Sequence, residues 1–239
     1  MDDKQKQIQD IVLSTPEALQ NPMGYVRNAI KDIGMAQLNR AIEYGTLPNL
    51  RCNTKTLITG DSDAALMVVM DYPTEVQAGI DKPISMFEGA ENIQGFLKSC
   101  FAAHDIDFNK ILWMNTVPYC PTKVDGNRMV YRTPLKKEID LCQTFVQYAV
   151  DLFHPPMLLL MGNVASNVYV RGTISRIRGT WQNVYCIPTM PTYSPNEMGE
   201  YRKVAPERAA TMLQDFKEDI AIAMTEYKRR YPNSSLFIK

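Results

Sequence analysis

The sequence lacks any apolar run that approaches the ~20 residues a helix needs to cross a membrane, and its N-terminus shows no signal-peptide pattern. These absences predict a soluble, intracellular protein of the cytoplasm with no membrane partner. Net charge is also absent, because 26 basic residues balance 26 acidic ones. Without a global positive field, any binding of nucleic acid must come from a local patch of charge.

Cysteines are few and are not densely spaced. The chain has five of them, an odd number, which argues against a disulfide scaffold. Repeats, low-complexity tracts and long linkers are absent as well. With 239 residues, 45% of them hydrophobic, the chain fits one sizeable α/β domain over residues 1–239.

Short apolar runs alternate with helical patterns along most of the chain. A helical lead over residues 1–45 precedes them, and a long amphipathic helix over 205–230 follows. This alternation predicts an α/β fold: a three-layer sandwich with a central, mainly parallel four-stranded sheet flanked by helices. The expected strands are residues 56–59, 65–70, 110–117, 157–161 and 183–188, and the expected intervening helices are 93–104, 134–152 and 163–170.

Parallel sheets bind ligands beyond the carboxyl ends of their strands. Four of the expected strands run into Pro-bearing or Gly-bearing loops, at residues 71–74, 115–121, 162 and 191–195. Each loop taken alone is consistent with an ordinary strand-to-helix turn. Because all four leave one edge of the sheet, together they predict an active site there.

The motifs in these loops occur in a familiar order. The chain resembles the uracil-DNA glycosylase superfamily over residues 45–220, and is most similar to its iron–sulphur (family 4 type) class. The late loop of that class reads P-T-x-H-P, where this chain has Pro191-Thr192-Tyr193-Ser194-Pro195. The other segments that carry the resemblance are Gly60–Val69, Asp71-Tyr72-Pro73-Thr74, Asp81-Lys82-Pro83-Ile84 with Gly89, Asn115 with Cys120-Pro121 and Asn127-Arg128, Leu160-Met161-Gly162 and Arg178-Gly179.

The resemblance implies roles for three residues. Asn115 matches the amide that reads the edge of a pyrimidine, because a side-chain amide presents a donor and an acceptor together. Asp71 matches the acidic residue that steers a water or stabilises a sugar cation. Ser194 replaces the His that stabilises the departing base, a loss that typically costs ~10²–10³ in rate. Asp71 is equally consistent with a helix or turn cap, and Asn115 with a turn residue at a strand end.

Further base-binding residues follow from the same comparison. Tyr72 replaces a small residue and narrows the pocket or contacts the base, while Pro73 shapes the turn. Ile84 stands near the position of a ring that stacks on uracil, and Phe87 is close enough in sequence to supply that ring instead. Tyr193 belongs to the same expected base-binding set.

The cysteines also match the family in part. In the iron–sulphur class, four Cys hold a [4Fe–4S] cluster. Cys52, Cys120 and Cys142 match three of those positions, and Asn49 stands at the fourth. The resemblance therefore implies either a cluster with a weak fourth ligand or three buried thiols without a metal. Cys100 and Cys186 are expected in the core.

DNA is the expected partner. Lys123, Arg128 and Arg178 flank motif positions and are the expected DNA-binding cations, with Pro195 and Met198 in the late loop. The predicted function is a DNA glycosylase that cleaves the N-glycosidic bond of a flipped uracil-like or modified pyrimidine base. The alternative is a catalytically inactive DNA-binding or replication-accessory protein, a partner of replication or repair proteins, that reuses the fold; an unrelated nucleotide- or sugar-binding α/β protein is a third interpretation.

Overall fold

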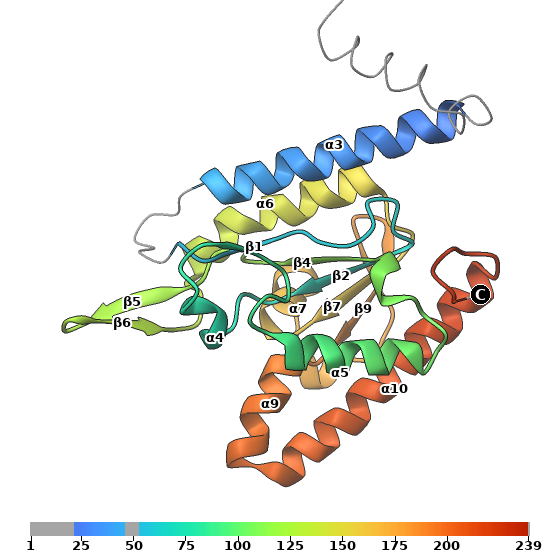
Figure 1. The fold of residues 1–239 in the computed structure, drawn as a ribbon. Helices are drawn as coiled ribbons and strands as arrows, with labels where there is room; N and C mark the ends of the chain where they lie inside the picture. Colours follow the sequence, from blue (N-terminus) through green and yellow to red (C-terminus); the bar gives the residue numbers. More distant parts are fainter. Residues whose placement is uncertain (1–21, 46–52, 239) are drawn as a thin grey trace, which may run out of the picture.

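The computed structural model describes residues 22–45 and 53–238 (Figure 1). A central sheet lies between two layers of helices, as the alternation of strands and helices predicts. Helices α3 (Pro22–Tyr44) and α6 (Lys136–Phe153) cover one face. Helices α5 (Glu91–Ala102) and α10 (Pro206–Arg230) cover the other, with α9 (Pro195–Val204) beside them. The fold is therefore a three-layer α/β sandwich.

The central sheet has the strand order β4-β2-β7-β9-β8. Its four parallel strands are β4 (Ile111–Asn115), β2 (Leu66–Met70), β7 (Leu158–Met161) and β9 (Ile187–Thr192). The fifth strand, β8 (Gln182–Val184), is antiparallel to β9. The four-stranded parallel sheet expected from the sequence is thus present, with one short antiparallel strand added at its edge.

The parallel strands are apolar because both of their faces are buried. Side chains alternate between the two faces along each strand. In β2, Leu66 and Val68 pack into the core under α5 and α10, whereas Met67 and Val69 pack into the core under α3 and α6. The continuous apolar run at residues 65–70 therefore fills two cores at once.

Two expected elements differ from the structure. The run at residues 183–188 is not one strand, because Tyr185 and Cys186 have φ angles of 51° and 63° and form the turn between β8 and β9. Such left-handed angles at both central residues are typical of a tight hairpin turn. Cys186 is consequently exposed, so the prediction that it lies in the core is wrong. Cys100 is buried, as predicted.

The other boundary difference is at α6. It begins at Lys136, after Pro134, and ends at Phe153, because the next residue, His154, has a left-handed φ of 48° that stops the helix before Pro155. Of the expected helical lead, residues 1–21 lie outside the described part of the chain. The expected strand at 56–59 is β1 (Lys55–Leu57), which pairs with β3 (Pro83–Ser85) in a separate two-stranded sheet.

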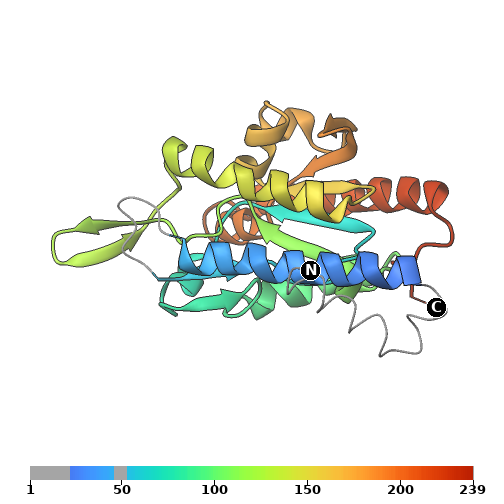
Figure 2. The same ribbon diagram turned by 90° about the horizontal axis from the view of Figure 1, so that it is seen from above.

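A hairpin formed by β5 (Thr122–Asp125) and β6 (Arg128–Tyr131) projects from the body of the molecule (Figure 2). Two contacts join the base of this hairpin to the rest of the protein. The Tyr131 hydroxyl donates to the Pro73 carbonyl at 2.8 Å, and Arg132 makes a bidentate ion pair with Glu138 at the start of α6. The hairpin is therefore anchored to the loop that follows β2.

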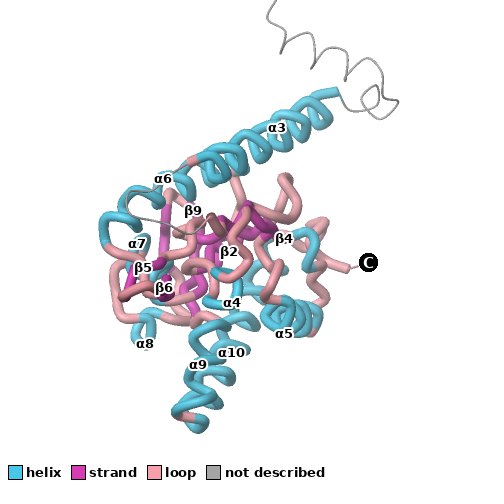
Figure 3. Tube along the Cα trace, turned by 60° about the vertical axis from the view of Figure 1, so that its left-hand side comes forward, coloured by secondary structure: helices cyan, strands magenta, loops and turns pink. Residues whose placement is uncertain are grey.

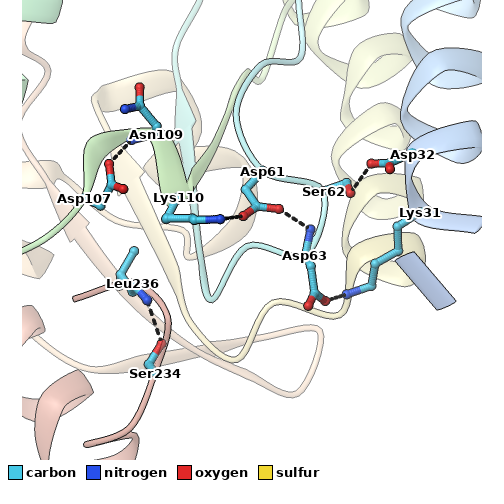
Figure 4. Close-up of polar contacts among 10 residues, drawn as sticks. All are labelled: Lys31, Asp32, Asp61, Ser62, Asp63, Asp107, Asn109, Lys110, Ser234 and Leu236. Atoms are coloured by element: carbon cyan, nitrogen blue, oxygen red, sulfur yellow. Dashed lines mark hydrogen bonds and ion pairs between the residues drawn. The ribbon is translucent and has the colours of Figure 1, made fainter. Parts of the chain in front are cut away.

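The loop before β2 is bonded to helix α3 at the end of the sheet away from the hairpin (Figure 4). Lys31 pairs with Asp63 at 2.5 Å, and the Ser62 hydroxyl donates to Asp32 at 2.5 Å. Asp61 accepts from Lys110, just before β4, at 2.9 Å. This acidic segment has a structural role at the amino ends of the strands. It lies away from the edge where ligands are expected.

The remaining helices are short turns between the larger elements. They are α4 (Glu75–Ala78), η1 (Phe108–Lys110), α7 (Asn163–Tyr169) and α8 (Ile174–Ile177); Figure 3 shows where α4, α7 and α8 lie around the sheet. None of the helices within residues 22–45 and 53–238 combines the length and hydrophobicity of a membrane span.

Candidate active site

Four strands of the central sheet end at the same level. Met70 in β2 is in register with Asn115 in β4 and with Met161 in β7, and Met161 is in register with Thr192 in β9. The loops that follow therefore leave one edge of the sheet side by side, which is where open α/β sheets bind ligands.

A pocket of about 230 Å³ lies at this edge. Its walls come from the loop after β2, the segment between β3 and α5, the end of β4, the start of α7 and the start of α9. The structure brings three sequence-predicted residues into it: Asp71, Asn115 and Ser194. The lining also includes Met70, Tyr72, Thr74, Gln77, Met86, Phe87, Ala90, Ile93, Thr133, Asn163, Val164, Asn196, Glu197 and Glu200.

Asp71 caps a helix far away in the sequence. Its Oδ1 accepts a hydrogen bond from the backbone N–H of Ala165, in the first turn of α7, at 2.9 Å. The pKa of the Asp71 carboxyl is raised to about 7, mainly by burial and also by the charge of Glu197, while hydrogen bonds from the α7 amides lower it. Near neutral pH this carboxyl is therefore poised between its two protonation states, as a group that moves protons needs to be.

Gly162 makes this contact possible. A β-carbon at Gly162 would lie 2.2 Å from Asp71 Oδ2, and the φ of this residue is +118°. Gly162 is also the N-cap position of α7, so no side chain there can satisfy the helix amides. Asp71 supplies the missing acceptor from the neighbouring strand. The glycine that the sequence marks as a strand end thus shapes the pocket.

Asn115 is held in place from outside the pocket. Its side chain is 3% exposed, and its Nδ2 donates to Thr56 Oγ1 at 2.8 Å. Thr56 in turn donates to the Pro118 carbonyl at 3.3 Å. The direction of these bonds turns the amide so that its nitrogen faces Thr56, and none of the described side chains or amides donates to Asn115 Oδ1.

Ser194 is the N-cap residue of α9 and is 3% exposed. Its hydroxyl makes no capping hydrogen bond with the helix. Pro195 follows at the first helical position, where its fixed φ suits the helix and its missing N–H costs nothing. A buried hydroxyl without a cap contact is therefore available to the contents of the pocket.

Two further carboxyl groups come from α9. Glu197 accepts from Asn163 Nδ2 at 3.0 and 3.1 Å, which joins the starts of α9 and α7. Burial raises the pKa of Glu197, Arg208 and the Asn163 hydrogen bond lower it, and Glu200 raises it again. Glu200 itself is exposed at the rim. The pocket is therefore acidic.

The other expected base-binding residues divide into two groups. Tyr72 and Phe87 line the pocket, and the Phe87 ring is fixed by an edge contact with Trp113 at 5.1 Å between centroids. Ile84 and Tyr193 are instead buried in the core. The carbonyl oxygen of Pro73 accepts a hydrogen bond from the Tyr131 hydroxyl. Phe87 therefore supplies a ring to the pocket where Ile84 does not.

The expected DNA-binding residues do not lie together. Lys123 and Arg128 are exposed on the projecting hairpin. Arg178 is engaged inside the protein, where it forms a bidentate ion pair with Asp219 at 2.8 and 3.0 Å. Pro195 and Met198 are buried and line a groove between α5, α9 and α10. DNA contact by these residues stays a prediction.

The cysteines give an incomplete ligand set. Cys120 and Cys142 are both buried, and burial, with Glu138 nearby, raises the pKa of Cys142 to about 12. Cys52 and Asn49 lie outside the described residues. Within the part of the chain that is described, no three His, Cys, Asp or Glu residues come together to hold a metal ion. The iron–sulphur cluster stays a prediction.

Comparison with known families bears on the fold of the chain. A family model of the uracil DNA glycosylase superfamily matches residues 75–218, more than half of the chain. The chain belongs to the uracil DNA glycosylase superfamily. The matched residues include Asn115 and Ser194 but begin just after the Asp71 loop. No curated protein matches the sequence.

In this superfamily member, two residues that hold pocket side chains in place have no sequence signal of their own. Thr56 is a single threonine in a three-residue strand, and Glu197 looks like a first-turn acidic residue of a helix. Their contacts with Asn115 and Asn163 cross 59 and 34 positions of the chain. No local pattern in the sequence therefore points to Thr56 or to Glu197.

Proposed function

We propose that the protein is a DNA glycosylase, which binds DNA and cleaves the N-glycosidic bond of a base that has been flipped out of the stack. The observation that carries the proposal is the shared pocket of Asp71, Asn115 and Ser194 at the aligned strand ends. A base-excising enzyme must hold one base in a snug pocket, with groups that answer the charges formed as the bond breaks.

Each pocket residue suits a part of that chemistry. Phe87 offers a ring on which a base can stack. Asn115 addresses the polar edge of the base. The Asp71 carboxylate stabilises positive charge on the sugar and accepts a proton from the attacking water, for which a pKa of about 7 is well placed. Ser194 offers a hydroxyl in place of an imidazole.

The DNA backbone is proposed to lie across the β5–β6 hairpin. Lys123 and Arg128 are exposed there, and the hairpin is tied to the pocket loop through Tyr131 and Pro73. Cations on a projecting element beside the pocket can neutralise phosphates without any global positive charge. The carboxyl groups of the pocket itself would repel phosphates, so the backbone must be held outside it.

A relationship to the iron–sulphur class is part of the proposal. Buried Cys120 and Cys142 are consistent with it. Cys52 and Asn49 would complete the set. A cluster held there would organise the chain around the hairpin base, and no catalytic step depends on it. Iron and sulphide analysis of anaerobically purified protein, with a Cys142→Ser variant as the control, tests this part.

Base release tests the main proposal. Oligonucleotides that carry single modified or deaminated bases are incubated with the protein, and free base is measured by mass spectrometry. We expect release from at least one of them, with on the order of 10²-fold loss in Asp71→Asn and in Asn115→Ala. DNA binding without release, and unaltered by either variant, would instead favour an inactive DNA-binding or replication-accessory protein.

A further inference from the structure

The pocket carries three carboxyl groups, from Asp71, Glu197 and Glu200, and no lysine, arginine or histidine among its described lining residues. The carboxyls share one space, because the charge of Glu197 acts on Asp71 and that of Glu200 acts on Glu197. Arg208 acts on Glu197 from α10, where its guanidinium lies 4.2 Å from the centre of the Tyr201 ring. The lining itself is therefore negative or neutral.

Two buried, neutral polar side chains line the pocket together with the carboxyl groups. Asn115 and Ser194 are each 3% exposed and line the pocket. Thr56 takes one hydrogen of the Asn115 amide, which leaves the carbonyl oxygen Oδ1 without a donor from the described residues. Ser194 Oγ likewise has no hydrogen-bond partner in the described part of the chain. Both atoms are therefore free to bond to a molecule that enters the pocket.

This arrangement suits an anionic leaving group poorly. Uracil leaves as an anion and needs a nearby donor or positive charge. Here Ser194 offers only a neutral hydroxyl, and Glu197 and Asp71 would repel the anion. The same carboxyls and the Asn115 carbonyl oxygen would attract a base that bears positive charge and N–H donors.

We propose that the pocket takes a base that carries both a positive charge and an exocyclic amino group, such as an N3-alkylated cytosine or an N-alkylated purine. The inference rests on the proposed glycosylase function and specifies its substrate class. The positive charge has two sources, namely alkylation of a ring nitrogen or protonation of an ordinary amino base in the pocket. The Asn115 carbonyl oxygen accepts from the amino group, and the carboxyls face the charge.

The reaction balances without any further reactant than water. The C1′–N1 bond of the N3-alkylated cytosine breaks, and its electron pair goes to N1, which neutralises the base. The sugar is left as an oxocarbenium cation beside the Asp71 carboxylate. Water adds to C1′, and its proton passes to Asp71 and then to solvent. The products are a neutral base, an abasic sugar and one proton.

The test compares four oligonucleotides that differ at one base: N3-methylcytosine, N7-methylguanine, cytosine or uracil. Free base is measured by mass spectrometry, and spontaneous loss without protein is subtracted. We expect the alkylated bases to be released on the order of 10²-fold faster than uracil. Glu197→Gln and the rim variant Glu200→Gln should reduce that preference about tenfold, as expected for the loss of about 1.4 kcal/mol of charge attraction. Glu218→Gln, an exposed change on α10, should leave it unaltered.

The outcomes separate the substrate class from the function. Release of cytosine that weakens as pH rises, together with the alkylated bases, identifies protonation as a second source of charge and supports the proposal. Release of uracil as fast as the alkylated bases overturns it while the glycosylase function stands. No release from any of the four overturns this inference, and the glycosylase function falls with it only if the wider panel of modified and deaminated bases is also not released.

Discussion

At the scale of single residues, the carboxyl of Asp71 has both a favourable and an unfavourable effect on folding. Its carboxyl caps α7 through the Ala165 amide, yet it lies in a buried space that disfavours its charge. The pKa rises from 3.8 to about 7 because burial outweighs the helix amides. Holding this group charged at neutral pH is therefore unfavourable for folding.

The stability of an Asp71→Asn variant should reveal that conflict. Since the folded-state pKa lies above the unfolded one, the destabilisation is absent below about pH 4, grows up to about pH 7 and is complete above it. The variant keeps an oxygen for the Ala165 amide but has no charge. We expect equal stability at pH 4 and a gain of up to about 4 kcal/mol at pH 8. Urea unfolding at both values measures it, and a gain that does not vary with pH would contradict the explanation.

Thr56 is a positioning residue, because it acts only through the Asn115 amide. Thr56→Val keeps the shape but leaves buried donors unpaired, at a cost of about 1–3 kcal/mol. We expect base release to fall about tenfold, mainly in kcat, with rescue by Thr56→Ser. Thr211→Val, whose hydroxyl bonds only to its own helix on an exposed face, is the matched control. Loss of stability with unchanged kcat would limit Thr56 to a structural role.

The meeting of Asp71, Asn115 and Ser194 could be predicted from the sequence, because parallel strands with aligned ends deliver their loops to one edge. Their detailed surroundings could not. Asp71 is bonded to an amide 94 positions away, and the anchor of Asn115 lies 59 positions before it. Such partners depend on how the strands are ordered in the sheet, which local patterns do not encode.

At the scale of elements, the two hairpins were the hardest parts to predict. The β8–β9 turn uses Tyr185 and Cys186, which are uncommon at positive φ, so the segment resembles one continuous strand. The β5–β6 hairpin is short and largely exposed, and lacks the buried face that gives a strand its alternating pattern. The long helices and parallel strands were predictable because they bury apolar faces.

The β5–β6 hairpin should carry part of the DNA affinity. Replacing both Lys123 and Arg128 with Ala removes two exposed cations, so the slope of log affinity against log salt should fall by about 2. Replacing Arg176 and Lys217, which are exposed outside the hairpin and the pocket, removes the same charge as a control. Fluorescence anisotropy at several salt concentrations provides the measurement. Equal effects of the two pairs would show that only net charge matters.

A buried ion pair joins three elements on the α10 side of the sheet. Asp219 on α10 is fully buried and accepts from Arg178, next to α8, and from the Thr192 hydroxyl at the end of β9. Burial raises the pKa of Asp219, while Thr192 and Arg178 lower it. The pair therefore fixes the strand from which the Ser194 loop departs.

Removing one partner should destabilise the protein strongly. Arg178→Met leaves a buried carboxylate unpaired, and we expect a loss of about 3–5 kcal/mol in the free energy of unfolding. Adding Asp219→Leu to that variant should recover part of the loss, because no charge then remains buried. Denaturant unfolding of the three proteins measures both steps. A loss below about 1 kcal/mol for Arg178→Met would mean that water reaches Asp219.

At the scale of the whole molecule, two cores lie back to back across one sheet. Leu66 and Val68 face one core while Met67 and Val69 face the other, so a change of side-chain volume at any of these residues acts first on the helix layer that it packs against. The composition of the chain predicts that enough apolar mass exists for such cores. The division between them depends on strand pleating, which follows once the strands are identified.

The two edges of the central sheet have a consequence for the behaviour of the protein at high concentration. One edge is β8, only three residues long, and at the other Thr59 exchanges two backbone hydrogen bonds with Trp113 of β4, at 2.8 and 3.1 Å. In the described part of the chain, neither edge offers a long row of unpaired amides to a second molecule. Exposed edges template aggregation, and parallel sheets, which fold slowly, are vulnerable to it. Shielding of this kind allows a protein without net charge to stay dispersed at high concentration.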